Sequence, residues 1–199
     1  MQVYGLTGGI ASGKTEAARR FAARGIPVID ADQAGHEAIA PGGAAEAAVL
    51  AAFGPDVCAH GRIDRDRLGA LVFRDAGARA RLNAIVHPVI IESVSRRCAQ
   101  LADDGAENVI VEAALLGEHG EKAPWLAGLI LVLSPTTVRV QRLVASRGLS
   151  EEEAWRRITA QTPPESKRSI ADWVIENDGD IAALYAQVDA VAEVIHGAV

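Results

Sequence analysis

The sequence has few of the residues that mark several common protein classes. It contains two cysteines, Cys58 and Cys98, and neither belongs to a C-x-x-C pair. This spacing excludes the usual zinc-binding and thioredoxin-like motifs, so we expect two reduced thiols in a cytosolic protein. Aromatic residues make up only 4% of the chain. We interpret its tryptophans as packing residues rather than as platforms on which nucleic-acid bases stack.

The chain also lacks an excess of positive charge and a long apolar run. Its 20 lysines and arginines are outnumbered by 26 acidic residues, which gives a net charge of −6. Nucleic-acid binders are normally basic, so we expect no nucleic-acid partner. No apolar run approaches the roughly 18–20 residues that cross a bilayer, and the N-terminus has no signal-like basic segment. We therefore expect no membrane partner and a cytoplasmic location.

What the sequence does contain is a glycine-rich stretch with the spacing of a phosphate-binding P-loop. Residues 8–15 read GGIASGKT and fit G-x-x-x-x-G-K-[ST]. An apolar strand is expected before it, over residues 3–7, and a helix after it, from about Lys14. In that context the backbone N–H groups and the helix N-terminus form an anion site. The alternative is a glycine-rich turn that binds nothing.

The P-loop predicts a nucleotide site with ATP and Mg2+ as cofactors. Lys14 is expected to reach the β- and γ-phosphates, and the hydroxyl of Thr15 is expected to ligate Mg2+. The predicted nucleotide-contacting residues of the loop are Gly9, Ile10, Ala11, Ser12, Gly13, Lys14, Thr15 and Glu16.

Further apolar segments alternate with helical ones and predict an α/β fold. Strands are expected at residues 26–29, 108–112, 129–133 and 171–175 in addition to 3–7. This alternation favours a five-stranded parallel sheet with helices on both faces. A serine N-cap at Ser134 and a proline at the first helical position are expected to begin the helix after the fourth strand.

Residues 41–103 contain no convincing buried strand and predict a helical insertion. Helices are expected at 44–53, 65–73 and 77–86, and another from Pro88 to about 101. The break at His87 is expected because a residue before proline avoids the helical region. Residues 139–169 form a second special segment, with seven basic residues in an acidic protein. We expect a helical lid there, with about two of its cations on phosphate.

Together these segments predict one P-loop kinase domain over residues 1–199. Its core is expected at about 1–32, 104–138 and 170–199. The helical insertion, expected to bind the acceptor, covers about 33–103, and the lid covers about 139–169.

Two carboxylates follow the second expected strand. Asp30 and Asp32 lie at the carboxyl end of that strand, on the same edge of the sheet as the P-loop. Either could serve as a base or hold a water of the metal, and either could instead cap the following helix. We expect one to cap and one to face the site, and Asp32 is the better candidate for catalysis.

Three classes of P-loop protein can be compared with these features. A GTPase needs Asn-Lys-x-Asp after a late strand, but residues 177–180 read NDGD. A mechanical ATPase normally shows an apolar strand ending in aspartate, whereas the candidate strand here ends in Glu112. A small-molecule kinase needs a P-loop, a carboxylate near the acceptor, an insertion and a basic lid, all of which are present.

The sequence resembles the dephospho-CoA kinase family over nearly its whole length. The segments that carry the resemblance are LTGGIASGKT at 6–15, VIDAD at 28–32, GRIDR at 61–65, IVHP at 85–88, Gln161 and ADWVIEN at 171–177. The resemblance implies transfer of the γ-phosphoryl group of ATP to the ribose 3′-hydroxyl of dephospho-CoA, the last step of coenzyme A synthesis.

The resemblance also implies roles for individual residues. Asp32 would accept or orient the proton of the ribose hydroxyl, and Thr7 would frame the reacting groups. Arg142, with Arg147 second, would cover the transferring phosphate, although Gln141 is the counterpart in another register. His87 is either a contact with the acceptor or a residue fixed by the following proline. Asn177 follows the last strand, where nucleotide kinases often contact adenine.

This sequence departs from the family pattern at several positions. Residues 114–118 read ALLGE where Pro-Leu-Leu-Phe-Glu is common. Ala11 stands where glycine is usual, and we expect an ordinary backbone angle there. The alternative function is another P-loop small-molecule or nucleotide kinase with a different acceptor, or an ATP-binding regulatory protein without transfer activity. A monomer is expected, with an oligomer left open.

Overall fold

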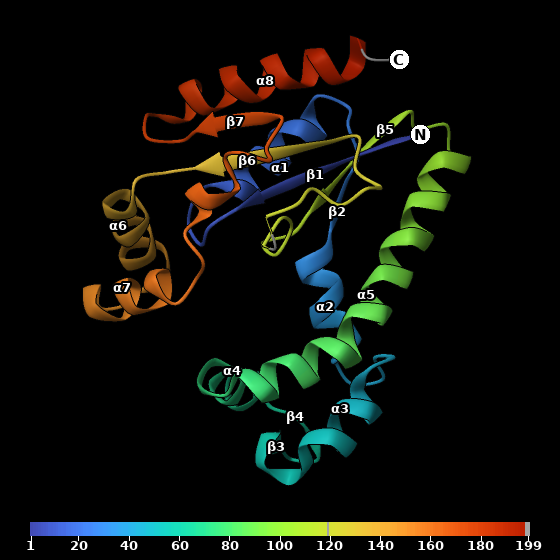
Figure 1. The fold of residues 1–199 in the computed structure, drawn as a ribbon, viewed down its shortest axis with the longest axis vertical. Helices are drawn as coiled ribbons and strands as arrows, with labels where there is room; N and C mark the ends of the chain where they lie inside the picture. The colour runs from blue at the N-terminus through green and yellow to red at the C-terminus, as the bar shows by residue number, and fades with distance from the viewer. Residues whose placement is uncertain (119, 198–199) are drawn as a thin grey trace. The chain divides into compact units, whose positions relative to one another are not determined.

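The computed structural model describes residues 1–118 and 120–197. Its main sheet has five parallel strands in the order β2-β5-β1-β6-β7, so the predicted five-stranded parallel sheet is confirmed (Figure 1). The strands are β1 (Gln2–Gly8), β2 (Val28–Asp30), β5 (Asn108–Glu112), β6 (Gly128–Leu133) and β7 (Trp173–Glu176). Every residue of β5 and β6 is buried, as expected for the inner strands of a parallel sheet.

The chain divides into two compact units, each described here by itself. The first unit comprises residues 1–30 and 100–199 and holds the five-stranded sheet. The second unit comprises residues 31–99. No helix in the described part of the chain is long and apolar enough to cross a membrane.

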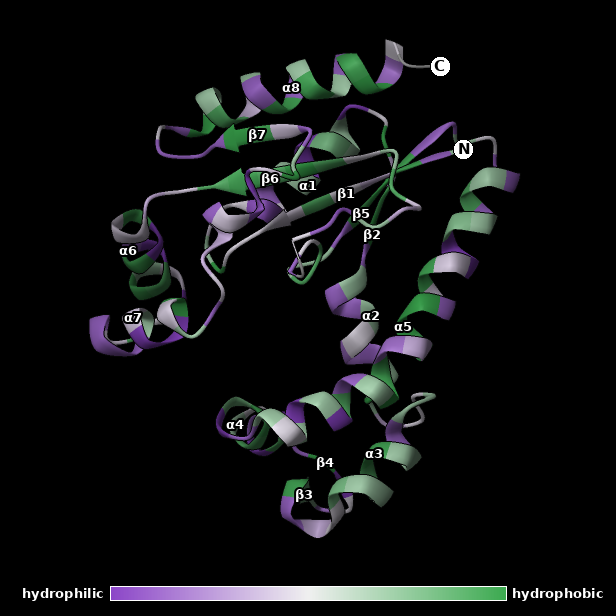
Figure 2. Cartoon of the chain, in the orientation of Figure 1, coloured by the Kyte–Doolittle hydropathy of each residue, from purple (hydrophilic) through white to green (hydrophobic). Residues whose placement is uncertain are grey.

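In the first unit, two helices cover one face of the sheet. They are α1 (Lys14–Ala23) and α8 (Ile181–Gly197). Phe21 of α1 and Val188 of α8 are fully buried against Leu6, Ile110 and Ile130 of the sheet. Figure 2 shows α8 with hydrophobic and hydrophilic residues alternating along its length, as expected for a helix with one face in a core.

The opposite face of the sheet is covered by less regular structure. The 3-10 helix η2 (Pro164–Lys167) contacts β6, and the segment after β5 lies over β1. A Cβ on Gly5 would lie within about 3 Å of side chains from Leu116, Leu126 and Leu129, so this glycine allows close packing there.

Two further helices of the first unit follow β6. They are α6 (Thr136–Arg147) and α7 (Glu151–Thr159). The Oγ of Ser150 accepts a hydrogen bond from the N–H of Glu153 and so caps α7. The predicted cap of α6 is one residue off, because Pro135 is the N-cap and the Ser134 hydroxyl bonds Arg142 instead.

The second unit is mainly helical. Its elements are α2 (Ala31–Ala38), α3 (Glu46–Phe53), η1 (Gly54–Val57), α4 (Arg65–Arg74) and most of α5 (Ala76–Asp103). The Asp64 carboxylate caps α4 by accepting bonds from the N–H groups of Asp66 and Arg67. Two short strands, β3 (Cys58–Ala59) and β4 (Arg62–Ile63), form an antiparallel hairpin that was not predicted.

The predicted helix break at His87 and Pro88 is wrong. α5 is one helix of 28 residues with Pro88 inside it, and Figure 1 shows it bending along its length. A proline costs the helix a hydrogen bond and bends it. Val86, Val89 and Ile90 on either side of the proline pack into the core of the second unit. That packing offsets the cost, so the helix continues.

Candidate active site

The P-loop connects the end of β1 to the start of α1, as the sequence predicts. Gly13 is the N-cap of α1 with φ 96°, in the left-handed region that favours glycine. A Cβ on Gly13 would overlap the side-chain amide of Asn177, and one on Gly9 would lie 2.6 Å from a guanidinium nitrogen of Arg139. Gly13 is therefore favoured by backbone angle as well as by close approach, whereas Gly9 is favoured by close approach alone.

Three side chains meet where β5 ends beside the P-loop. The Nζ of Lys14 lies 3.2 Å from Oε1 of Glu112. The Oγ1 of Thr15 donates a hydrogen bond of 3.1 Å to the same oxygen. The Glu112 side chain is only 5% exposed. In the sequence, Glu112 is only a poor match to a metal-binding aspartate. Its position at the end of a strand near the P-loop was the feature that could have indicated a site residue.

The P-loop has a further feature that fits a bound phosphate. The side-chain oxygen of Ser12 is buried and has no hydrogen-bond partner among the described residues. A buried hydroxyl without a partner is costly. Together with the crowded glycines and the N-terminus of α1, this hydroxyl makes the loop a suitable cradle for the anionic phosphates of a nucleotide.

Arg142 and Asn177, both predicted site residues, contact the backbone of the P-loop. Nη1 of Arg142 donates to the carbonyls of Ala11 at 3.4 Å and Ser12 at 3.3 Å. Its Nη2 lies 3.2 Å from both oxygens of Asn177. The amide of Asn177 donates to the Ser12 carbonyl at 2.8 Å. Arg147, by contrast, is exposed at the end of α6.

Arg139 and Gln161 are site residues to which the sequence reading gave no role. Arg139 lies three residues before Arg142 on α6, and this helical spacing on one face was the available signal. Its Nε donates to the Ile10 carbonyl at 2.8 Å. Burial lowers the pKa of the Arg139 guanidinium, and the nearby Glu165 carboxylate opposes that change. Arginine still stays protonated at neutral pH.

The expectation of an ordinary backbone angle at Ala11 is wrong. Ala11 has φ 59°, in the left-handed region. An L-residue there costs roughly 1–2 kcal/mol. Ile10 and Ala11 pack against an apolar cluster of α6 and α7 that includes Leu143 and Ile158. These apolar contacts stabilise the loop in this conformation.

Thr7 is fully buried at the end of β1 and faces away from α1. Its hydroxyl lies 3.2 Å from the carbonyl oxygen of Ala114 and 3.3 Å from that of Leu116. The buried Lys167 donates to both Thr7 Oγ1 and the Ala114 carbonyl. The stretch that departs from the family pattern is therefore tied to β1 through backbone carbonyls, which a residue of any type at these positions provides.

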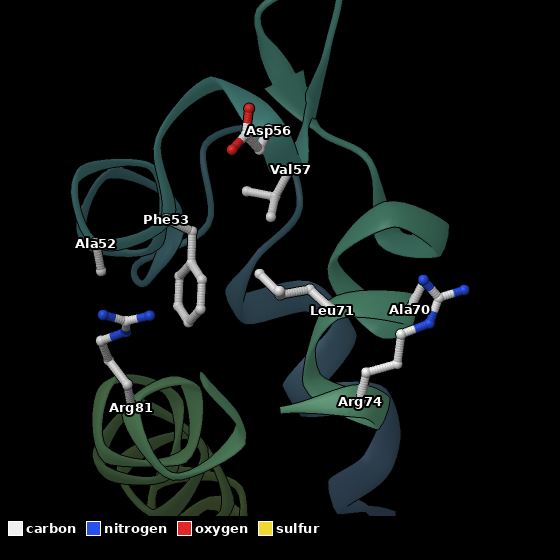
Figure 3. A pocket seen from close by; sticks show the side chains of 8 residues that line it. All are labelled: Ala52, Phe53, Asp56, Val57, Ala70, Leu71, Arg74 and Arg81. Carbon is white, nitrogen blue, oxygen red and sulfur yellow. The ribbon is translucent and has the colours of Figure 1, made fainter. Parts of the chain in front are cut away.

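Two predicted site residues lie in the second unit. Asp32 is exposed in the first turn of α2, and His87 is exposed within α5. This unit contains a hollow of about 430 Å³, and Figure 3 shows the side chains that line it. The Arg81 guanidinium lies beside it, 4.8 Å from the ring centroid of Phe53. No predicted site residue is among the described residues that line this hollow.

Comparison with known proteins identifies relatives across the whole chain. Residues 2–183 match the family model described as dephospho-CoA kinase. The dephospho-CoA kinase of Thermobifida fusca is 44% identical over 194 residues, covering 97% of this chain and 96% of the relative.

Solved structures share the fold of this chain. A crystal structure of a Thermus thermophilus protein is 35% identical with a TM-score of 0.84, covering 98% of this chain and 97% of that one. The dephospho-CoA kinase of Campylobacter jejuni shares the fold at 24% identity and a TM-score of 0.61, over 98% of this chain and 97% of its own. Because both the family model and a relative of high identity span nearly all of it, this chain belongs to the dephospho-CoA kinase family.

Proposed function

We propose that the protein transfers the γ-phosphoryl group of ATP to the ribose 3′-hydroxyl of dephospho-CoA, which gives coenzyme A and ADP. Membership of the family supports the reaction. The observation that carries the proposal is the meeting of Lys14, Thr15 and Glu112 at the P-loop, beside the N-terminus of α1.

MgATP would supply the phosphoryl group, and its metal ion would neutralise part of the negative charge on the phosphates. The Lys14 ammonium would bind oxygens of the β- and γ-phosphates, and the Thr15 hydroxyl would ligate Mg2+. Glu112 already accepts a bond from Thr15, so its carboxylate is suited to hold a water of the metal. Residues 9–16 would supply the remaining contacts to the nucleotide.

Asp32 is the proposed partner of the acceptor hydroxyl. Asp30, the last residue of β2, pairs in register with Glu112 at the carboxyl end of the sheet. Asp32 follows Asp30 by two residues, and two residues of chain span at most about 7 Å. Its carboxylate would accept the hydroxyl proton or hold the oxygen in line. Phosphoryl transfer demands positioning more than early proton abstraction, so orientation is the larger part of this role.

The remaining predicted residues take supporting roles in the proposal. Arg142 would place positive charge beside the P-loop, and Arg147 would add to it when the lid of residues 139–169 covers the nucleotide. Asn177 would lie by the adenine. Thr7 and His87 would contact the acceptor, with His87 presented by the insertion of residues 33–103. We further propose a cytoplasmic monomer that acts on small molecules, without a nucleic-acid or membrane partner.

The experiment that tests the function is ADP release from MgATP with a panel of acceptors. The panel contains dephospho-CoA, adenosine, AMP and shikimate, with a reaction that lacks an acceptor. Among these acceptors, we expect rapid ADP release only with dephospho-CoA. Release that favours another member of the panel would support the alternative kinase function. Release without any acceptor would show that the protein hydrolyses ATP instead.

A further inference from the structure

Two side chains from the α6–α7 region hold the backbone of one P-loop residue from both sides. The Oε1 of Gln161 accepts a 2.8 Å hydrogen bond from the N–H of Ile10. The Nε of Arg139 donates a 2.8 Å hydrogen bond to the carbonyl of the same residue. The Gln161 oxygen also lies 3.4 Å from Nη2 of Arg139, which links the two side chains.

The Ile10 peptide is held at the entrance to the strained part of the loop. Ala11, the next residue, has φ 59°. The Ser12 N–H that follows bonds the Gly9 carbonyl at 3.1 Å, and the N–H groups at the start of α1 are the ones expected to face the phosphates. The side chain of Arg139 is only 1% exposed and lies directly against Gly9. A buried guanidinium is costly unless its donors are used, and here Nε binds the loop backbone and Nη2 lies near the Gln161 oxygen.

We propose that Gln161 and Arg139 are positioning residues that hold the P-loop in its phosphate-binding conformation through Ile10. Gln161 fixes the N–H of Ile10, while Arg139 fixes its carbonyl. Neither side chain touches the substrate. The inference rests on the proposed function only in that the P-loop binds ATP.

This role predicts a selective effect on ligand binding. ATP and ADP both place phosphates on the P-loop, so loss of the Gln161 contact lowers the affinity for both nucleotides. Dephospho-CoA as acceptor does not use the loop backbone, so its affinity stays the same. If Gln161 had a purely structural role, its replacement would instead lower the affinity for all ligands together with the stability of the protein.

The test uses the full chain and three variants. Gln161→Leu removes the acceptor atom. Gln161→Glu keeps an oxygen that can accept from Ile10 and pair with Arg139. Gln100→Leu makes the same chemical change at an exposed position of α5. Dissociation constants for ATP, ADP and dephospho-CoA are measured by titration calorimetry, with a melting curve for each protein.

We expect Gln161→Leu to lower the affinity for ATP and for ADP roughly tenfold, which is the effect of one lost hydrogen bond. Dephospho-CoA affinity should change less than twofold. Gln161→Glu should recover most of the ATP affinity, and Gln100→Leu should match the wild type. If Gln161→Leu fails to fold, Gln161→Asn, whose amide is one methylene shorter, takes its place.

Two results would overturn the proposal. One is unchanged ATP affinity in the variant that lacks the Gln161 contact. The other is an equal loss for ATP and dephospho-CoA with a lowered melting temperature. A protein that binds ATP as predicted but does not phosphorylate dephospho-CoA would contradict the proposed function and leave this inference standing.

Discussion

The ammonium of Lys14 and the carboxylate of Glu112 form an ion pair of 3.2 Å, in which the carboxylate side chain is 5% exposed. Lys14 begins α1 and Glu112 ends β5, so the pair joins the P-loop to the neighbouring strand. Charges this well buried depend on each other, because a lone buried carboxylate is strongly unfavourable. Lys14 therefore contributes to stability as well as to the chemistry of the site.

Replacement of this lysine should separate the two contributions. We expect Lys14→Ala to reduce kcat at least about a hundredfold, since a charge that stabilises the transferring phosphoryl group is lost. It should also lower the free energy of unfolding by about 3–5 kcal/mol, because Glu112 stays buried without its cation. Urea denaturation and steady-state kinetics measure the two effects.

The double variant Lys14→Ala/Glu112→Gln is the control for that prediction. Removal of the carboxylate charge should restore much of the lost stability and none of the lost activity. Recovery of turnover in the double variant would contradict the catalytic role of Lys14. Equal instability of the single and double variants would contradict the energetic role of the ion pair.

Asp32 provides a second prediction about the chemistry. Asp32→Asn keeps the shape of the side chain but removes its charge and its ability to take a proton. We expect kcat to fall about 10²–10⁴-fold, the usual contribution of a general base, with less than a twofold change in ATP affinity. Rapid-quench turnover and calorimetric ATP binding measure these quantities. Asp30→Asn is the matched control, and a larger loss there would assign the role to Asp30.

The left-handed backbone at Ala11 predicts an unusual response to glycine. Ala11→Gly relieves roughly 1–2 kcal/mol of strain, while the freer unfolded chain costs about 0.4–1 kcal/mol. We expect the unfolding free energy to stay the same or rise by up to about 1 kcal/mol. Ala22→Gly, at an exposed position of α1, should instead lower it by about 0.5–1 kcal/mol. If both variants lose the same stability, the backbone strain at Ala11 is refuted.

Asp172 predicts how stability depends on pH. Partial burial raises its pKa, but bonds from the Lys122 ammonium and the Leu129 N–H outweigh that effect, so the pKa lies below its ordinary value. Folding therefore favours the charged carboxylate. Its contribution is complete above the unfolded pKa of about 3.9 and is lost as the pH falls through the folded pKa.

Asp172→Asn should accordingly flatten the acid side of the stability curve. Because the side chain is 37% exposed, solvent screening keeps the effect below about 1 kcal/mol. Denaturation in urea between about pH 6 and pH 3 compares the variant with the wild type. The wild type should lose more stability over this range, and parallel curves would exclude a contribution from Asp172.

Much of the fold could be predicted from short stretches of sequence. The P-loop between β1 and α1, the cap at Asp64 and the apolar strands β5 and β6 depend on neighbours in the chain. The wrong predictions depend on tertiary packing. Pro88 lies inside α5 because apolar residues on both sides of it pack into one core. Ala11 takes a left-handed angle in a loop packed against α6 and α7.

The same distinction applies to the site. Lys14, Thr15 and Asp32 are identified by a motif or by a place at the end of a strand. Gln161 bonds Ile10 across 151 positions of the chain, and no local pattern indicates that pair. Glu112 is intermediate, since its place at the end of a strand was visible but its contact with Lys14 required the parallel order of β1 and β5.

The most direct test of the account is the location of the new phosphate. The protein is incubated with MgATP and dephospho-CoA, and the product is analysed by mass spectrometry and phosphorus NMR. The proposed reaction adds one phosphoryl group per acceptor, attached as a monoester to the ribose 3′-oxygen, with one ADP formed for each. A phosphate on any other atom, or an acceptor recovered unchanged while ATP is consumed, would contradict it.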